Sequence, residues 1–447
     1  MKIKITNIGP IHKFEIDLSK KLTMIYGKNN IGKSYAISLV YMLLKALPNQ
    51  EQKNEIRNKI IDITNRLKLN QPLHDNIRLA LTLFLKENFS EKFVGYLRAS
   101  YGDYKFIVNH YSEGIPIIEL FSERMRIQYV ISEIYYSNGG GITCFAKLSD
   151  VVKSEEYTIE TLQDECMNFI GSFIDEVSEF NSNYHYLPAV KTGIFQGLGN
   201  IGTIIAKINP YSTRLDNRGF DLPRMTIPVS DFYLNLSSAK TIDSPEVTTT
   251  VINKIEEKIL NGRMELDTKT GKIYYLSQNV ELPFEIFQVS SMVGEVGLLT
   301  VYLKYLLKTY NFEPINRNSR EKTLESSSVV FFEEPEAHVH PESQIKLMEL
   351  LVELANTGVH LVLTTHSDFM LNCLGNQLLA HKIKSQQVGS LHLSRTEHGS
   401  IILKDMYANS DGIKDHNFYE ATDTLYRERI RLNEERNFRL SRKIKKH

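Results

Sequence analysis

Residues 22–34 read LTMIYGKNNIGKS, and this segment sets the expected architecture. A short apolar run of the buried-strand type ends at Gly27, and a helical pattern begins near Gly32. The loop between them matches G-x-x-x-x-G-K-[ST], in which glycines let successive backbone N–H groups point at phosphate oxygens. The N-terminus of the next helix adds partial positive charge. We therefore expect a phosphate-binding loop formed by Gly27, Lys28, Asn29, Asn30, Ile31, Gly32, Lys33 and Ser34.

Two side chains at the end of this loop have separate expected tasks. Lys33 should reach the β- and γ-phosphates of a nucleotide, and the Ser34 hydroxyl should ligate Mg²⁺. ATP and Mg²⁺ are therefore the expected ligands of the loop.

A second segment, SSVVFFEEPEAHVHPE at residues 327–342, places two carboxylates directly after an apolar strand. In an open parallel sheet the carboxyl ends of the strands face the ligand crevice. One of Glu333 and Glu334 can hold the Mg²⁺ shell, and the next can orient and deprotonate the attacking water. His338 and His340 form an HxH pair, but no third ligand of regular spacing follows, so we expect them to pack the loop.

Two further polar segments lie next to apolar elements. His366 follows the buried strand of LVLTTHS, where a neutral imidazole can contact the γ-phosphate and respond to its loss. QVSSMVGEVG, residues 288–297, puts two serines and two glycines before a long apolar helix, which makes a second candidate for phosphate binding. Ser290, Ser291 and Gly294 are the residues expected there.

The order of patterns along the chain predicts an α/β protein with a mixed β-sheet core. We expect an N-terminal part of the core at 1–46, an inserted and mainly helical lobe at 47–183, the rest of the core with small insertions at 184–410, and a basic helical tail at 411–447. Within the lobe, KFIV at 105–108 is expected to form a short strand.

Composition excludes several classes of protein. The 53 basic and 53 acidic residues balance, so binding to nucleic acid would need a local patch. The three cysteines are scattered, which fits the reducing cytoplasm, and no apolar stretch is long enough to span a membrane. Residues 425–447 hold nine Lys or Arg and three Glu. This helix either contacts DNA or an acidic partner, or is simply solvated.

GKNNIGKS, SSMVGE, FFEEPEAHVHPE and LTTHS occur in that order, and the set resembles the ATPases of the RecF/Rad50/SMC class. Within that class it is most similar to the OLD-like AAA ATPases of prokaryotic defence systems. The resemblance covers about residues 1–46 and 184–408, and it implies a P-loop NTPase fold of the ABC/RecF type. Residues 50–180 match no family segment that we can name.

The resemblance also implies roles for individual residues. Gly27 to Ser34 would be Walker A, Glu333 the Walker B acid, Glu334 the catalytic glutamate and His366 the switch histidine. The stretch from Pro335 to Pro341 would lie at the dimer seam. Ser290, Ser291 and Gly294 would form the signature motif that meets the ATP of another subunit, and Gln196 or Lys191 would take the Q-loop role.

Some features depart from the family pattern. The signature reads SSMVGE rather than LSGGQ, and the Walker B acid is Glu333 rather than Asp. The 300 residues between Lys33 and Glu333 disfavour a transporter ATPase, and the chain lacks the long coiled coil of SMC and Rad50. No acidic DxD cluster follows Lys404, so a Toprim nuclease domain is not expected.

The resulting expectation is a cytoplasmic ATPase that sandwiches ATP in a homodimer or larger homo-oligomer, with no membrane partner. Hydrolysis would be coupled to DNA, through the basic tail, or to a separately encoded effector such as a nuclease, in anti-phage defence. The alternatives are a RecF-like DNA-repair ATPase and an ATP-gated sensor or scaffold with little turnover.

Overall fold

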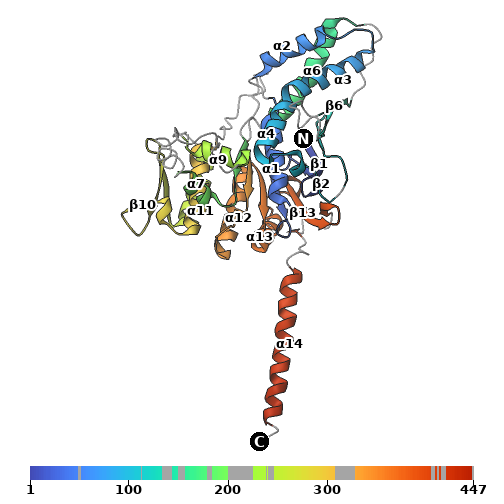
Figure 1. Cartoon of the computed structure of the whole chain (residues 1–447). Coiled ribbons are helices and arrows are strands. Elements are labelled where there is room, and N and C mark those ends of the chain that lie inside the picture. The colour runs from blue at the N-terminus through green and yellow to red at the C-terminus, as the bar shows by residue number, and fades with distance from the viewer. Residues whose placement is uncertain are drawn as a thin grey trace, which may run out of the picture.

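The computed structural model describes residues 1–48, 52–111, 113–132, 143–149, 157–178, 184–199, 225–237, 239, 246–307, 328–403, 408–409, 412–413 and 419–444. Within them the main feature is an 11-stranded sheet with the order β6-β5-β4-β1-β2-β14-β13-β3-β12-β11-β7. Helices pack against this sheet, and a long helix extends away from it (Figure 1). The expected α/β fold with a mixed sheet is confirmed.

One half of the sheet is parallel. Its strands, from the edge inward, are β7 (Tyr184–Leu187), β11 (Val329–Glu333), β12 (His360–Thr365), β3 (Leu22–Tyr26) and β13 (Val388–Thr396). Glu333 pairs with Thr364, and Thr365 pairs with Tyr26. Parallel strands bring their carboxyl ends to one edge. The loops after β3, β11 and β12 therefore meet there.

The other half of the sheet is mostly antiparallel. β1 pairs with β2, and β4 continues the sheet from β1 through β5 to β6, while β14 runs parallel to β2. These strands are β1 (Lys2–Ile8), β2 (Ile11–Asp17), β4 (Ile117–Phe121), β5 (Met125–Val130), β6 (Thr143–Leu148) and β14 (Gly399–Leu403). The segment 47–183 thus supplies three strands to the main sheet in addition to its helices.

Alternate residues of each central strand serve different apolar cores. Val329 and Phe331 of β11 join one buried cluster, and Val330 and Phe332 join the other. Because both faces of the sheet are covered, the sequences of these strands are apolar at successive positions and do not alternate between apolar and polar residues. Helix α1 (Lys33–Ala46) packs in the first cluster. Helices α11 (Ser291–Leu306), α12 (Pro341–Asn356) and α13 (Asp368–Leu379) pack in the second.

The helices of the inserted segment stand at the upper end of the molecule in Figure 1. They are α2 (Lys53–Asn65), α3 (Leu73–Leu85) with its continuation η2 (Lys86–Ser90), α4 (Glu91–Tyr101) and α6 (Ile159–Ser178). Their apolar stripes are buried with those of α1 in a single cluster.

The prediction of a strand at KFIV, residues 105–108, is wrong. Tyr104–Phe106 forms the 3₁₀ turn η3, and Val108 makes only an isolated bridge with Ile8. The Ile107 carbonyl accepts a hydrogen bond of 2.7 Å from the Gly9 N–H, which holds the chain in this turn. A buried Ile107 within a turn gives the same apolar signal as a short strand.

The remaining elements surround the parallel half. β8 (Gly262–Asp267) and β9 (Lys272–Ser277) form a hairpin, and in its turn the Asp267 carboxylate accepts from the Lys269 N–H at 2.9 Å. The others are α7 (Lys191–Gly199), α9 (Ile227–Ser237), α10 (Glu246–Ile255), η5 (Glu256–Leu260), β10 (Pro283–Glu285), η6 (Ile286–Gln288), η7 (Ser385–Gln387), β15 (Ala408–Asn409) and β16 (Gly412–Ile413).

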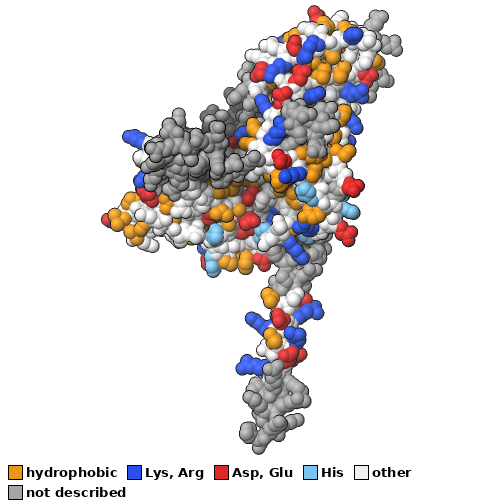
Figure 2. All heavy atoms as spheres, viewed as in Figure 1, with side chains coloured by type: hydrophobic (Ala, Val, Ile, Leu, Met, Phe, Trp, Pro, Cys, Tyr) orange, Lys and Arg blue, Asp and Glu red, His pale blue; other side chains and the backbone are white. Residues whose placement is uncertain are grey.

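The C-terminal helix α14 (Tyr419–Ile444) extends away from the sheet (Figure 1). Its side chains Leu425, Tyr426, Ile430 and Leu432 are exposed. Basic and acidic side chains alternate along its described part (Figure 2), and residues 445–447 lie outside the described residues. None of the described helices is both long and apolar enough to cross a membrane.

Candidate nucleotide-binding site

The loop between β3 and α1 has the backbone shape that a phosphate cradle needs. Gly27 and Gly32 adopt φ values of 139° and 92°, and Asn30 adopts 57°. A Cβ on Gly27 would lie 2.2 Å from the Leu393 carbonyl oxygen, and one on Gly32 would lie 2.7 Å from a Pro10 side-chain atom. The glycines are therefore required both by conformation and by space.

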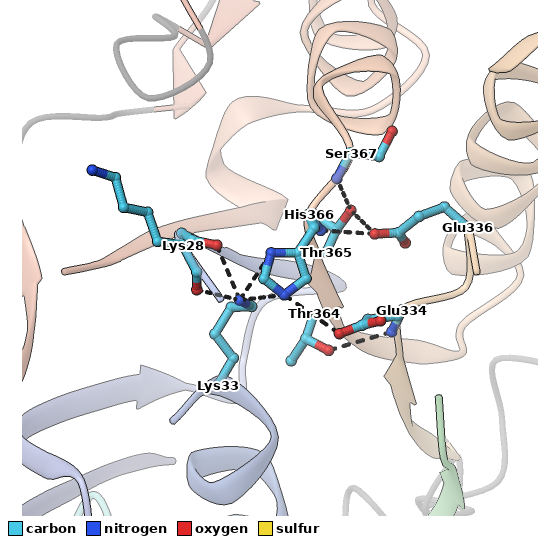
Figure 3. Close-up of polar contacts among 9 residues, drawn as sticks. Lys28, Lys33, Glu334, Glu336, Thr364, Thr365, His366 and Ser367 are labelled. Carbon is cyan, nitrogen blue, oxygen red and sulfur yellow. Dashed lines mark hydrogen bonds and ion pairs between the residues drawn. The ribbon is translucent and has the colours of Figure 1, made fainter. Parts of the chain in front are cut away.

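Lys33 lies inside this loop (Figure 3). Its Nζ donates to the carbonyl oxygens of Gly27 and Lys28, each at 3.0 Å, and lies 2.7 Å from His366 Nε2. Burial lowers the pKa of Lys33 to about 8, and the nearby charges of Glu334 and Glu336 oppose that shift. The ammonium is thus directed into the loop, where it would meet a phosphate.

Glu333 ends β11 in a half-buried position next to Ser34. Its carboxylate accepts hydrogen bonds from the Tyr186 hydroxyl, the Ala189 N–H and the Ser34 hydroxyl. Burial raises the pKa of Glu333, while these donors act in the opposite direction. The sequence predicts that Glu333 and Ser34 serve the same ion, and the structure brings them into contact.

Glu334 turns away from the strand and faces His366 and Lys33 (Figure 3). Its φ of 41° lies in the left-handed region, and its N–H donates to the Thr364 carbonyl at 2.9 Å. The Oε1 atom of Glu334 lies 3.4 Å from His366 Nε2. A hydrogen bond from His366 lowers the pKa of Glu334, and the charges of His366, Lys33 and Lys191 add to this effect. The half-buried carboxylate is therefore ionised at neutral pH.

The His366 ring bridges the cation and the anion of the site. When Nε2 has no proton it accepts from Lys33, and when it has one it donates to Glu334. A group that can change partners in this way suits a sensor of the charge placed between Lys33 and Glu334.

Glu336 is a site residue that the sequence reasoning did not single out. It is buried, and its Oε1 accepts from Thr365 Oγ1 at 2.6 Å and from the His366 N–H at 2.7 Å. Burial raises the pKa of Glu336. It thus fixes the backbone of His366 (Figure 3). The available signal was a third carboxylate in EEPE, two residues after the pair.

The donor set fits a Mg²⁺ ion that also binds phosphate. The Ser34 hydroxyl and Glu333 carboxylate are hard oxygen ligands, as Mg²⁺ prefers. The described residues hold no group of three or more His, Cys, Asp or Glu that could bind a metal. Such an ion would therefore complete its shell from phosphate and water. His340 instead caps α12, and its Nδ1 accepts from the Glu342 N–H at 3.4 Å.

The serine-glycine segment lies at the start of α11. Ser290 caps this helix, accepting from the Val293 N–H at 3.5 Å, and both Ser290 and Ser291 are exposed. Gly294 is buried against Thr192, where an added Cβ would lie 2.8 Å from Oγ1. Within the part of the chain that the structure describes, no hydrogen bond joins Ser290 or Ser291 to the loop at Gly27–Ser34. The hydroxyls face outward at the N-terminus of a 16-residue helix.

The two Q-loop candidates occupy different environments. Gln196 is exposed on α7, whereas Lys191 is buried at its start. Lys191 Nζ lies 3.4 Å from Glu295 Oε2, and the charges of Glu333 and Glu336 also act on it. The Lys191 and Thr192 N–H groups both donate to the Glu295 carboxylate at 3.0 Å. The start of α7 therefore connects the Walker B end of the sheet to helix α11.

The sheet and the loop at Gly27–Ser34 have the arrangement of a P-loop NTPase fold. Within the chain, residues 205–372 match the family model described as "AAA domain, putative AbiEii toxin, Type IV TA system". This match includes the signature segment, the Glu333–Glu334 pair and His366. The closer resemblance to OLD-like ATPases stays a prediction.

Solved structures of SMC heads are similar to this chain. The SMC head bound to the C-winged helix domain of ScpA has 10% identity and a TM-score of 0.40, covering 90% of this chain and 96% of that one. The SMC head domain from Thermotoga maritima has 11% identity and a TM-score of 0.35, covering 90% and 97%. The Pyrococcus furiosus Smc head with an extended coiled coil, bound to the C-terminal domain of ScpA, has 10% identity and a TM-score of 0.38, covering 96% and 98%.

These scores describe loose superpositions, and the family model covers less than half of the chain. No curated protein matches this chain in sequence.

Proposed function

We propose that this chain binds ATP with Mg²⁺, hydrolyses it, and couples the cycle to closing and opening of a homodimer. The observation that carries the proposal is the convergence of Lys33, Glu334 and His366 beside the Ser34–Glu333 pair. Three loops of one sheet edge supply these groups, which is the arrangement that phosphoryl transfer requires.

Each side chain has a role that follows from its geometry. Lys33 and the loop N–H groups would hold the β- and γ-phosphates, and Ser34 and Glu333 would hold Mg²⁺, which would supply positive charge to neutralise the phosphates. Glu334, kept ionised by His366 and the nearby lysines, accepts a proton from the attacking water. His366 contacts the γ-phosphate and returns to Glu334 when the phosphate departs.

The signature segment supports a dimer. Ser290 and Ser291 are exposed at a helix N-terminus, where hydroxyls and N–H groups suit a phosphate. The ATP that they would meet is bound by a second copy, so closing requires nucleotide at the seam. Of the Q-loop candidates, Lys191 is better placed than Gln196 to transmit the change, because it contacts Glu295 of α11.

The output that we propose is a separately encoded effector, such as a nuclease, or DNA, in anti-phage defence. The site supplies an ATPase set, and the tail α14 is an exposed helix with a basic end. On the face seen in Figure 2, Lys and Arg side chains are interspersed with Asp and Glu and form no continuous basic surface. Because the 53 basic and 53 acidic residues of the chain balance, DNA contact would have to be local, and the tail is its candidate.

ATP binding and hydrolysis by the wild type, Glu334→Gln and Lys33→Ala, with and without double-stranded DNA, test the proposal. We expect Glu334→Gln to keep ATP binding and to lose hydrolysis by about 10²–10⁴-fold. Lys33→Ala should lose binding. Hydrolysis by Glu334→Gln at the wild-type rate would exclude Glu334 as the base.

A wild type that binds ATP and dimerises without turnover would instead support the sensor or scaffold alternative. A wild type whose hydrolysis is stimulated only by one kind of DNA junction would favour the RecF-like alternative.

A further inference from the structure

A line of hydroxyl groups runs behind Glu333 toward the inserted segment. Tyr186 of β7 donates to Glu333 Oε1, and its hydroxyl oxygen lies 2.9 Å from Ser38 Oγ of α1. Ser38 in turn hydrogen-bonds the hydroxyl of Tyr101, the last residue of α4. Four residues from four separate elements, α1, α4, β7 and β11, are therefore joined in one path.

The direction of this path is fixed at the carboxylate. An ionised carboxylate only accepts hydrogen bonds, so Tyr186 must donate to Glu333. Each hydroxyl has one proton, so the Tyr186 oxygen is left to accept from Ser38, and the Ser38 oxygen to accept from Tyr101. Each hydroxyl in this line of hydrogen bonds polarises the next one. The hydrogen bond from Tyr186 to Glu333 is therefore strengthened by the groups behind it.

The surroundings leave these groups little freedom. Tyr186 is 1% exposed and Ser38 is 6% exposed. The Tyr186 ring packs edge-on against Tyr41 at 5.3 Å and stacks with Phe331 at 6.4 Å. The Tyr101 ring packs against Tyr35 at 4.7 Å, beside the loop residue Ser34. Packing therefore fixes both phenol rings, and the hydroxyls are presented at set positions.

Glu333 needs such a support. It stands where the family pattern has Asp, so its carboxylate has one more rotatable bond to fix. Its other side-chain donor is Ser34, whose hydroxyl is also the expected Mg²⁺ ligand. Without Tyr186, the Glu333 carboxylate would depend on Ser34 for its side-chain hydrogen bond. The Ser34 hydroxyl would then be less available to bind Mg²⁺.

We propose that Tyr186 is the positioning residue that holds Glu333 for Mg²⁺, and that Ser38 and Tyr101 tie this position to the inserted helical segment. The proposal rests on the proposed function, since it concerns the metal that accompanies ATP. It gives the segment 47–183 a physical route to the nucleotide site, through the end of α4.

Nucleotide affinity measured as a function of Mg²⁺ tests the proposal. A fluorescent ATP analogue is titrated in EDTA, and Mg²⁺ is then titrated at fixed nucleotide. For Tyr186→Phe we expect the Mg²⁺ midpoint to rise about tenfold, while affinity in EDTA stays at the wild-type value. A general structural defect would lower the affinity in EDTA as well.

Tyr41→Phe is the matched control. Tyr41 is also a buried tyrosine, and its hydroxyl donates to Asp231 at 2.8 Å, away from Glu333. We expect its Mg²⁺ midpoint to match the wild type. Thermal melting of both variants checks that the packing of the two rings is retained.

The link to the inserted segment is tested by a double-mutant cycle. Tyr101→Phe should raise the Mg²⁺ midpoint less than Tyr186→Phe does, and should add nothing in the Tyr186→Phe background. Additive effects would contradict a path that runs through Tyr186. A Tyr186→Phe midpoint less than about twofold above wild type would overturn the positioning role.

Failure of the proposed function looks different, because the wild type would then bind no nucleotide with or without Mg²⁺.

Discussion

Three glutamates within four positions have three different environments, and this separates their roles. Glu333 is half-buried beside hydroxyl donors, Glu334 faces a histidine and two lysines, and Glu336 accepts from Thr365 and the His366 N–H. Burial raises the pKa of Glu333 and Glu336, while hydrogen bonding and positive charge lower that of Glu334. The one that remains a free anion toward the loop is therefore Glu334, which is the property that a base needs.

Lys33 gives a pH prediction. Burial lowers its pKa to about 8, and only the protonated form attracts phosphate. Bound phosphate raises that pKa, so ATP affinity should be constant below pH 8 and fall by up to about tenfold per pH unit above it. Isothermal titration calorimetry of ATP binding between pH 7 and 9.5, in two buffers of different ionisation enthalpy, measures the protons taken up. We expect proton uptake only at the upper end of this pH range.

Lys33→Arg cannot lose its charge in this range. The ATP affinity that remains in Lys33→Arg should not depend on pH. If it falls above pH 8 as the wild-type affinity does, a group other than Lys33 causes the pH dependence.

Glu336 gives a stability prediction. Glu336→Ala would leave Thr365 Oγ1 and the His366 N–H without their acceptor, at a cost of about 1–3 kcal/mol in the free energy of unfolding. Glu336→Gln keeps an acceptor oxygen and should cost less. Urea denaturation of the three proteins measures both values, and equal losses for Ala and Gln would show that the charge, not the acceptor, matters.

At the scale of elements, the segment that joins β7 to α7 connects the Glu333 end of the sheet to helix α11. The Ala189 N–H reaches Glu333, and two residues later Lys191 pairs with Glu295 of α11. Gly294 lets α11 approach Thr192 closely. A few residues of backbone thus connect Glu333 to α11.

Gly294→Ala tests this close approach. Its Cβ would lie 2.8 Å from Thr192 Oγ1, so we expect a loss of about 1–3 kcal/mol in the free energy of unfolding. Gly95, inside α4, has no atom within 4 Å of an added Cβ. Gly95→Ala should therefore stabilise by about 0.5–1 kcal/mol. Equal effects of the two substitutions, measured by denaturant titration, would contradict tight packing at Gly294.

The sequence was most informative where chemistry and local structure coincide. Gly27, Lys33 and His366 lie next to apolar strands, and patterns of that kind can be read without a structure. Glu336, Tyr186 and Ser38 could not be found in this way, because their roles depend on contacts between segments more than 25 residues apart. The KFIV strand failed for a related reason, since tertiary contact with Gly9 decided the local conformation.

At the scale of the whole molecule, the sheet joins parts of the chain that the sequence suggested were separate. β4 to β6 of the inserted segment continue the sheet from β1, and their apolar residues share a cluster with α1. The inserted segment therefore packs against α1, the helix that follows the loop at Gly27–Ser34. The signature hydroxyls face outward on the opposite half of the sheet.

The most direct test of the account is the mass in solution of Glu334→Gln with Mg²⁺ and ATP, compared with ADP. Because this variant should bind ATP without hydrolysing it, we predict a dimer of twice the monomer mass in ATP and a monomer in ADP. Adding Ser290→Arg, which places a bulky side chain at the exposed signature, should return the ATP form to the monomer. A Glu334→Gln protein that binds ATP yet has the same mass in ATP and ADP would contradict nucleotide-driven closure of the dimer.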